Sequence, residues 1–185
     1  MKCLDLIATR YSVRQYDPKP VEKEKLDKVL EAGRLAPTSW NLQPQRVYVL
    51  QSEEAMDKLR AVSPMHFGAP VVLVICYDET QEWHTSLLND AMPETVDWED
   101  YHTGALDCCF VADHMALEAT ELGLGTCIIR GFDEKIIHDA LGLPETSRIV
   151  VMLDLGYEDE FCIESPGHLG GEPQRKDLEE TVTFL

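Results

Sequence analysis

Apolar residues recur along the chain with two spacings, one typical of helices and the other typical of strands. Helical spacing marks four segments, residues 3–9, 22–36, 104–122 and 133–143. Alternating or continuous apolar runs rich in β-forming residues mark three strands, residues 46–51, 69–77 and 147–157. The helices and strands interleave without a strict βαβ rhythm, and no segment repeats another. The pattern therefore predicts an α+β or mixed α/β fold.

The longest predicted helix, residues 104–122, has small side chains along one face. That face is formed by Ala105, Cys108, Cys109, Ala112, Met115, Ala116 and Ala119. Side chains of this kind let a second helix approach closely, so we expect this helix to pack against another one.

The composition of the chain limits the kinds of partner it can have. Its 185 residues include 16 Lys and Arg against 34 Asp and Glu, which gives a formal net charge of −18. Such an acidic chain repels nucleic acid and anionic membranes, so neither is an expected partner. The length favours a single domain, residues 1–185, with a sizeable core.

Two further features favour a soluble, cytoplasmic protein. The six cysteines show no C-x-x-C spacing, and four of them lie in apolar stretches, as buried thiols do in a reducing compartment. The N-terminal residues show no basic-then-apolar targeting signal, and no apolar run approaches the roughly 18 residues of a membrane helix.

The cations are concentrated in the two ends of the chain. Between Arg60 and Arg130 there is no Lys or Arg, whereas this interval carries twelve acidic residues. A bound phosphate would therefore have to be neutralised by the N-terminal and C-terminal thirds of the chain.

Two short stretches carry candidate chemistry. RYSVR, residues 10–14, sets two arginines and a serine on alternate positions, so an extended backbone would point all three to one side. The arginine fork suits phosphate, but paired surface charges on an edge strand give the same pattern. APTSWNLQP, residues 36–44, fits an ordinary loop between a helix and a strand equally well. Neither stretch is decisive alone.

Two other patterns are weaker. GLGTCIIRG, residues 123–131, has Ile128 where a dinucleotide fingerprint needs its third glycine, so Gly123 and Gly125 are better explained by a helix end and a turn. His114 and Glu118 lie four residues apart on the long helix, but a metal site needs three or four ligands and no third presents itself. We therefore predict no metal.

Taken in order along the chain, these motifs resemble the FMN-dependent nitroreductase family. The resemblance rests on R-x-S-x-R and then on A-P-T-S-x-N-x-Q-P entering a strand. It continues through ELGLGTCIIRGFDEKIIHDALGLPETSRIVVMLDLGY, residues 121–157, and ends in QRKDLEETV, residues 174–182. It covers nearly the whole chain except residues 78–103.

The resemblance implies a three-layer α+β fold, with a central, mostly antiparallel sheet flanked by helices, and an intertwined homodimer. It implies that a C-terminal arm, residues 172–185, reaches the partner chain and that residues 78–103 form a variable insert. Trp83, Trp98 and Tyr101 are interleaved with acids in this insert, which favours a substrate lid over a mere loop.

The resemblance also implies non-covalent FMN at two sites on the dimer interface. It assigns Arg10 and Ser12 to the phosphate and ribityl region, Arg14 to the pyrimidine edge of the flavin, and Arg175 to the phosphate. These cations come from the two ends of the chain, where the charge map requires them.

Other implied contacts come from the loop and from the second half of the chain. Ser39 and Asn41 would reach the flavin of the partner subunit, and the backbone of Arg130 and Gly131 would lie at flavin N5 and O4. The full set of implied cofactor-binding residues is Arg10, Tyr11, Ser12, Arg14, Pro37, Thr38, Ser39, Asn41, Gln43, Ile128, Ile129, Arg130, Gly131 and Arg175. Two positions depart from the family pattern: Asp177 replaces a proline, and Gln45 replaces a frequent aromatic residue.

The activity implied by the resemblance is hydride transfer from NADH or NADPH, through flavin N5, to a small electrophile such as a nitroaromatic or a quinone. No side chain is obligatory for this chemistry, because the flavin carries it. Two alternatives stay open. One is a protein that stores FMN without turnover, and the other is a specialised member of the deiodinase or flavin-fragmenting type. The insert has no lysine of the kind found in deiodinase lids, which lowers that last option.

Overall fold

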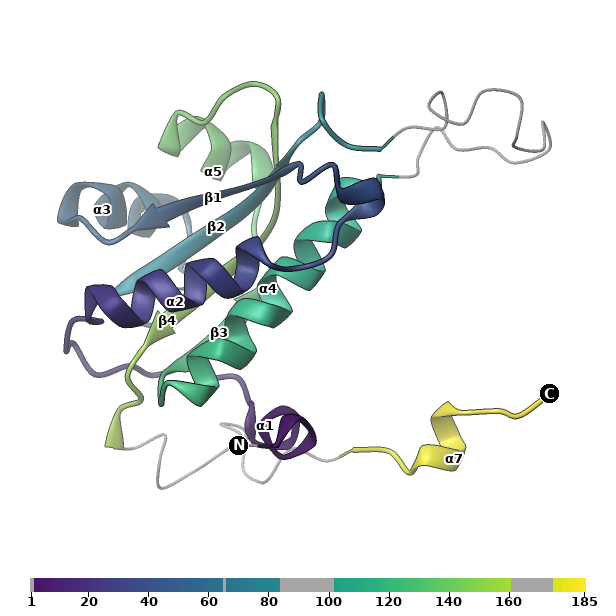
Figure 1. Ribbon diagram of the computed structural model, residues 1–185. Coiled ribbons are helices and arrows are strands. Elements are labelled where there is room, and N and C mark those ends of the chain that lie inside the picture. Colours follow the sequence, from purple (N-terminus) through teal and green to yellow (C-terminus); the bar gives the residue numbers. More distant parts are fainter. Residues whose placement is uncertain (1, 65, 84–101, 161–174) are drawn as a thin grey trace, which may run out of the picture.

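Four strands form one antiparallel sheet at the centre of the protein, in a computed structural model that describes residues 2–64, 66–83, 102–160 and 175–185 (Figure 1). The elements in chain order are α1 (Cys3–Thr9), α2 (Lys23–Arg34), η1 (Ser39–Asn41), β1 (Gln45–Leu50), α3 (Glu53–Val62), β2 (Val71–Asp78), α4 (Thr103–Glu121), β3 (Gly125–Ile129), α5 (Glu134–Leu141), β4 (Ser147–Gly156) and α7 (Leu178–Thr181). The strands lie in the order β1-β2-β4-β3, and each neighbouring pair is antiparallel.

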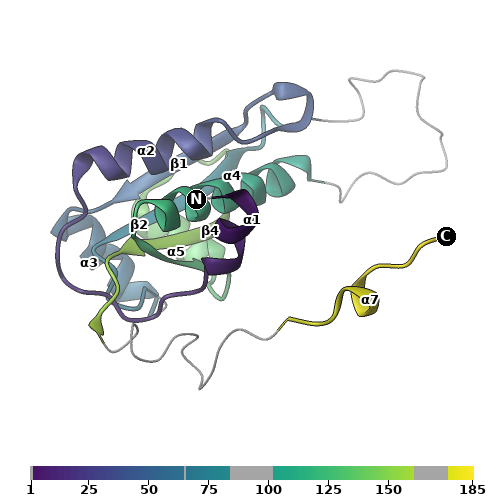
Figure 2. The same ribbon diagram turned by 60° about the horizontal axis from the view of Figure 1, so that its bottom comes forward.

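Helices cover both faces of this sheet. The two middle strands, β2 and β4, are buried along almost their whole length. One core cluster joins the sheet to α2 and α4, and a second joins its other face to α3 and α5 (Figures 1 and 2). The prediction of a three-layer α+β fold with an antiparallel sheet is therefore confirmed.

The small-residue face of α4 packs closely against α2, as the sequence predicts. Cys108, Ala112 and Ala116 on this face are fully buried. Gly33 of α2 lies directly over Met115, and a side chain at position 33 would collide with the Met115 thioether. Close packing of α2 on α4 thus depends on the absence of a side chain at Gly33.

Each predicted helix and strand is present, with bounds that differ by at most two residues at either end. The pattern does not predict α3 or β3. α3 nevertheless carries clear signals, because the Ser52 hydroxyl accepts a hydrogen bond from the Ala55 N–H and acids occupy its first turn. β3 follows Gly123, whose φ of +72° ends α4 as expected, but the chain then enters a strand where only a turn is expected.

The described C-terminal residues, 175–185, stand away from the sheet and its helices in both views (Figures 1 and 2). The helix α7 begins with a capping box formed by Asp177 and Glu180, which gives the aspartate at this position a local role. Leu178 and Phe184 are 71% and 93% exposed. Thr181 belongs to α7, and residues 182–185 have no regular structure in the single chain.

Asp154 is a carboxylic acid buried inside the sheet. Its side chain has no solvent exposure, and neither carboxyl oxygen has a hydrogen-bond partner within the described parts of the chain. It lies on β4 between Val72 of β2 and Cys127 of β3. Burial raises the pKa of Asp154 to about 8, so the carboxyl group is mostly protonated at neutral pH.

We expect Asp154 to lower the stability of the fold as the pH rises from about 4 to about 8. The unfolded chain releases this proton near its ordinary pKa of 3.8, whereas the folded protein holds it until about pH 8. Between these values the folded state binds more protons, so this group lowers the free energy of unfolding by up to about 1.4 kcal/mol per pH unit. Asp154→Asn removes this titration.

Urea denaturation of both proteins at pH 4.5, 6 and 7.5 checks this expectation. The variant should gain stability relative to the wild type as the pH increases, by a total on the order of a few kcal/mol. A difference that stays constant over this range would show that Asp154 is already ionised, or solvated, in the folded protein.

Candidate functional site

The RYSVR segment runs beside the edge strand β3. α1 ends at Arg10, and the chain continues in an extended conformation. Ser12 forms a parallel bridge with Thr126, and the Val13 N–H donates to the Thr126 carbonyl at 2.8 Å. Val13 is buried, whereas Arg10, Ser12 and Arg14 are only partly buried. The sequence expectation of an extended segment is thus met.

Three polar side chains of this segment influence the thiol of Cys127 on β3. Burial raises the pKa of Cys127, while the positive charge of Arg14, a hydrogen bond from Ser12 and the positive charge of Arg10 oppose that rise. This influence of all three groups on one thiol agrees with side chains at alternate positions of an extended segment facing β3. The alternation in the sequence is what places them there.

Arg10 and Arg14 form no ion pair with a carboxylate in the parts of the chain that the structure describes. Other arginines do so readily: Arg34 pairs with Glu31 at 2.6 Å, and Arg148 pairs with Glu79 at 2.7 Å. In a chain with a net charge of −18, two neighbouring arginines left without acids are unusual. This arrangement favours a bound anion over a solvated edge strand.

Gly125 allows the segment to approach β3 closely. A Cβ atom at this position would lie 2.6 Å from Val13 Cγ2 and 2.9 Å from Glu158 Cγ. The second glycine of GLGTCIIRG is therefore needed for this approach, and sequence reasoning gave it only a role in a turn. Tyr11 points elsewhere, because its hydroxyl donates to Glu158 Oε2 at 2.7 Å. The structure does not bring the Tyr11 hydroxyl to the three polar groups.

The residues predicted to make backbone contacts lie at the other end of β3. Ile129 is buried, Ile128 is 39% exposed, and Arg130 and Gly131 follow them on the surface. One nitrogen of the Arg130 guanidinium lies 4.0 Å from the Cys109 sulfur of α4. A single edge strand thus connects the arginine cluster with the backbone of residues 128–131.

The APTSWNLQP loop has an unusual backbone. Trp40, Asn41 and Gln43 all have positive φ values, of 52°, 57° and 54°. Asparagine tolerates this conformation, but for the other two residues it costs on the order of 1 kcal/mol or more each. The Gln43 N–H donates to Thr38 Oγ1 at 3.1 Å, which helps to close the loop. Pro37, at the start of the loop, is exposed.

A buried acid of α4 holds the first half of this loop. The Ser39 N–H donates to both carboxyl oxygens of Asp107, at 3.0 and 3.1 Å, and the Ser39 hydroxyl donates to one of them at 3.1 Å. Asp107 is only 2% exposed. Burial raises its pKa, and the hydrogen bonds from Ser39 oppose that rise.

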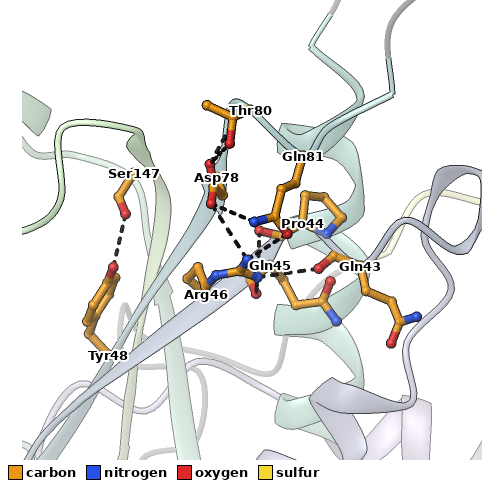
Figure 3. A network of polar contacts seen from close by, with 9 residues as sticks. All are labelled: Gln43, Pro44, Gln45, Arg46, Tyr48, Asp78, Thr80, Gln81 and Ser147. Atoms are coloured by element: carbon orange, nitrogen blue, oxygen red, sulfur yellow. Dashed lines mark hydrogen bonds and ion pairs between the residues drawn. The ribbon is translucent and has the colours of Figure 1, made fainter. Parts of the chain in front are cut away.

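Arg46 of β1 holds the second half of the loop (Figure 3). Its Nη1 donates to the carbonyls of Gln43, Pro44 and Gln45, at 3.4, 3.4 and 2.8 Å. Its Nη2 donates to Gln81 Oε1 at 2.7 Å and lies 3.6 Å from an Asp78 carboxyl oxygen. In Figure 3 the guanidinium lies between the loop carbonyls and the end of β2. Sequence reasoning assigned no role to Arg46 or to Asp107, whose contact with Ser39 spans 68 positions.

The structure says less about the remaining predicted residues. Trp98 and Tyr101 lie outside the described residues. Trp83 is 7% exposed, and its carbonyl accepts a hydrogen bond from the Thr103 hydroxyl at the start of α4. Arg175 lies exposed at the start of the described arm. The role of Trp83 in a substrate lid stays a prediction, and so does the contact of Arg175 with a phosphate.

Several large apolar side chains are exposed on α1, α4 and the loop. Leu106 and Phe110, one turn apart on α4, are about half exposed, at 49% and 50%. Leu4 of α1 is 75% exposed and Trp40 of the loop is 69% exposed. Side chains of this size on neighbouring elements are typical of a protein interface.

Two kinds of site have no support among the residues that the structure describes. There, no group of three or more His, Cys, Asp or Glu side chains is arranged to hold a metal ion. Nor is any helix in these ranges long and apolar enough to span a membrane.

The chain is similar over most of its length to several known proteins. A family model described as "Nitroreductase family" matches residues 7–65 and 60–157. The structure of a nitroreductase family protein from Clostridium difficile 630 is 33% identical, with a TM-score of 0.80 over 100% of this chain and 98% of that one. A Thermus thermophilus protein named NADH dehydrogenase is 30% identical over 198 residues, 95% of this chain and 92% of the relative. The structure of a Staphylococcus epidermidis protein named as an NAD(P)H:FMN oxidoreductase is 22% identical, with a TM-score of 0.77 over 98% of this chain and 95% of that one, and shares the fold.

We expect Gly125→Ala to push the RYSVR segment away from β3. The added Cβ would overlap Val13, and overpacking of this kind costs about 1–3 kcal/mol of unfolding free energy. Val13→Ala removes the nearest of the overlapping atoms, Cγ2, so the double variant should lose less than the sum of the two single losses. Thermal or urea denaturation of the four proteins measures this coupling. Strictly additive losses would mean that the close approach of Val13 to Gly125 does not constrain the segment.

Proposed function

The chain belongs to the nitroreductase family, and on that basis we propose that it is an FMN-dependent oxidoreductase that carries hydride from NADH or NADPH to a small electrophile. The observation that carries the proposal is the pair of arginines, Arg10 and Arg14, with Ser12 between them, held against β3 without carboxylate partners in the described ranges. The names of similar proteins support the donor and the cofactor, because they include NADH dehydrogenase and NAD(P)H:FMN oxidoreductase.

The residues of the chain fit the chemical groups of FMN. Arg10, Ser12 and Arg14 offer the cations and hydroxyl that a phosphate and a polar ring edge require. Arg130 and Gly131 are exposed residues, so their backbone would be accessible to a flavin ring. When bound, FMN supplies the hydride chemistry at N5, with nitroaromatics or quinones as candidate acceptors. The chain binds, orients and shields the cofactor.

A homodimer is part of the proposal. The exposed Leu106 and Phe110 of α4 give an apolar surface, and the exposed C-terminal arm has no packing against the described body in Figures 1 and 2. A second copy of the chain would cover both. Ser39 and Asn41 of one subunit would then act at the cofactor of the other, so a cofactor site would be complete only in the dimer.

The absorption spectrum of the purified protein tests the proposal. We expect a yellow protein with one FMN per chain, whose flavin bleaches with NADH or NADPH under anaerobic conditions and recovers its colour with a nitroaromatic or a quinone. Failure to bind added FMN would contradict the proposal. A yellow protein that neither nicotinamide reduces would indicate a store of FMN instead.

We expect Arg175→Ala to weaken FMN binding by about 1.5–3 kcal/mol, the typical worth of a charge-assisted hydrogen bond to phosphate. Fluorescence titration of the apoprotein with FMN measures this change. Lys176→Ala removes a neighbouring exposed cation and serves as the matched control, with an expected loss below about 0.5 kcal/mol. Equal losses in both variants would reduce the role of Arg175 to general electrostatic attraction.

We expect deletion of residues 174–185 to abolish both the dimer and the bound FMN. Removal of the arm takes away Arg175 and the apolar residues Leu178, Phe184 and Leu185, which are exposed in the single chain. Light scattering gives the mass, and absorbance gives the FMN content. A monomer that still holds one FMN per chain would show that each site is built within one subunit.

A further inference from the structure

The loop of residues 37–44 needs anchors because its backbone is strained. Trp40 and Gln43 are not glycines, yet both have positive φ values of 52° and 54°. A conformation of this kind persists only where surrounding contacts determine it. Arg46 supplies the contacts on the β1 side of the loop, through three backbone carbonyls (Figure 3). Asp107 supplies them on the other side, through Ser39.

Asp107 is committed almost entirely to the loop. It is 2% exposed, and the hydrogen bonds that hold its two oxygens come from Ser39. Burying a carboxyl group costs free energy, and the nearby charge of Glu82 adds to that cost. A nonpolar residue would serve the packing of α4 better. The acid at this position is therefore best explained by what it holds.

The contact also fixes what Ser39 can offer to a ligand. Its N–H and its O–H both donate to Asp107, so the hydroxyl oxygen can only accept a further hydrogen bond. Ser39 would thus face a donor group, such as a hydroxyl of a sugar-like chain or a ring N–H. Without Asp107 the hydroxyl could rotate and donate instead.

We propose that Asp107 is a positioning residue that locks the loop in the conformation in which Ser39 and Asn41 reach the partner subunit's cofactor. This inference rests on the proposed function, since it assumes FMN sites shared between two chains. Asp107 would not touch the cofactor itself. It would act through Ser39, and from a helix whose exposed Leu106 and Phe110 would be covered by a second copy in the proposed dimer.

The first experiment compares variants as homodimers. Asp107→Ala should weaken FMN binding at least tenfold, measured by fluorescence titration, while the dimer mass stays unchanged by light scattering. Asp107→Asn keeps an acceptor oxygen and should lose less. Glu82→Gln is the matched control, because Glu82 is another buried acid, accepts from the Gly104 N–H at the start of α4, and has no hydrogen bond to the loop among the described residues. Its FMN affinity should stay within about threefold of the wild type. Equal losses for Asp107→Ala and Glu82→Gln would overturn the proposal.

The second experiment separates positioning from general damage by mixing subunits. Asp107→Ala spoils the loop, which acts on the partner's site, whereas Arg10→Glu spoils the arginine cluster, which acts on its own site. Two tagged chains, one with each change, are expressed together and purified as the heterodimer. One of its two sites then combines an intact loop with an intact arginine cluster. We expect about one FMN per heterodimer, although each homodimer binds little.

A parallel heterodimer of Asn41→Ala and Arg10→Glu distinguishes the two ways of failing. Complementation by Asn41→Ala but not by Asp107→Ala would leave the shared site intact and refute the role of Asp107. No complementation by either would refute the sharing of sites between chains, and with it the premise of the proposal. Recovery of one FMN in both heterodimers, with wild-type affinity, supports the positioning role, because a chain damaged as a whole could not contribute an intact site.

Discussion

The pairing of residues 10–14 with the edge strand β3 is the contact on which the candidate site depends. A backbone hydrogen bond of 2.8 Å from Val13 to Thr126 keeps the segment extended, and Gly125 leaves the space for it. Extended backbone sends alternate side chains to one side, so Arg10, Ser12 and Arg14 must point together. On an unpaired segment the same three side chains would lose this shared direction, and with it their capacity to hold one anion.

The charge of the chain makes this placement informative. Most surface charges of a protein with a net charge of −18 are expected to find partners, and Arg34, Arg60 and Arg148 do pair with acids. Such exposed pairs add little stability. Arg10 and Arg14 have no carboxylate partner in the described chain. Both guanidinium groups can therefore still bind an anionic ligand. In this respect Arg10 and Arg14 differ from the three paired arginines.

The sequence predicts the parts of the fold whose signals are local. The strands 71–78 and 147–156 are continuous apolar runs because they lie in the middle of the sheet, and α4 shows its packing face as a row of small residues. β3 has no such signal, because its five residues become a strand only by pairing with β4 and with residues 12–13. α3 could have been found from its cap at Ser52.

The arginine cluster was predictable from alternation and from the family resemblance. The anchor at Asp107 was not, since Asp107 and Ser39 are 68 positions apart in sequence.

Asp107 and Asp154, the two buried aspartates among the described residues, show how one residue type can have opposite consequences. Both are removed from water, and burial raises the pKa of each. At Asp107, three hydrogen bonds from Ser39 offset part of that cost, and the same bonds fix the conformation of the loop. Asp154 has no partner in the described chain, so its burial is a cost to stability that grows with pH. A buried polar group is therefore informative about function only after its partners are known. By that criterion Asp107, and not Asp154, is the candidate for a role in the site.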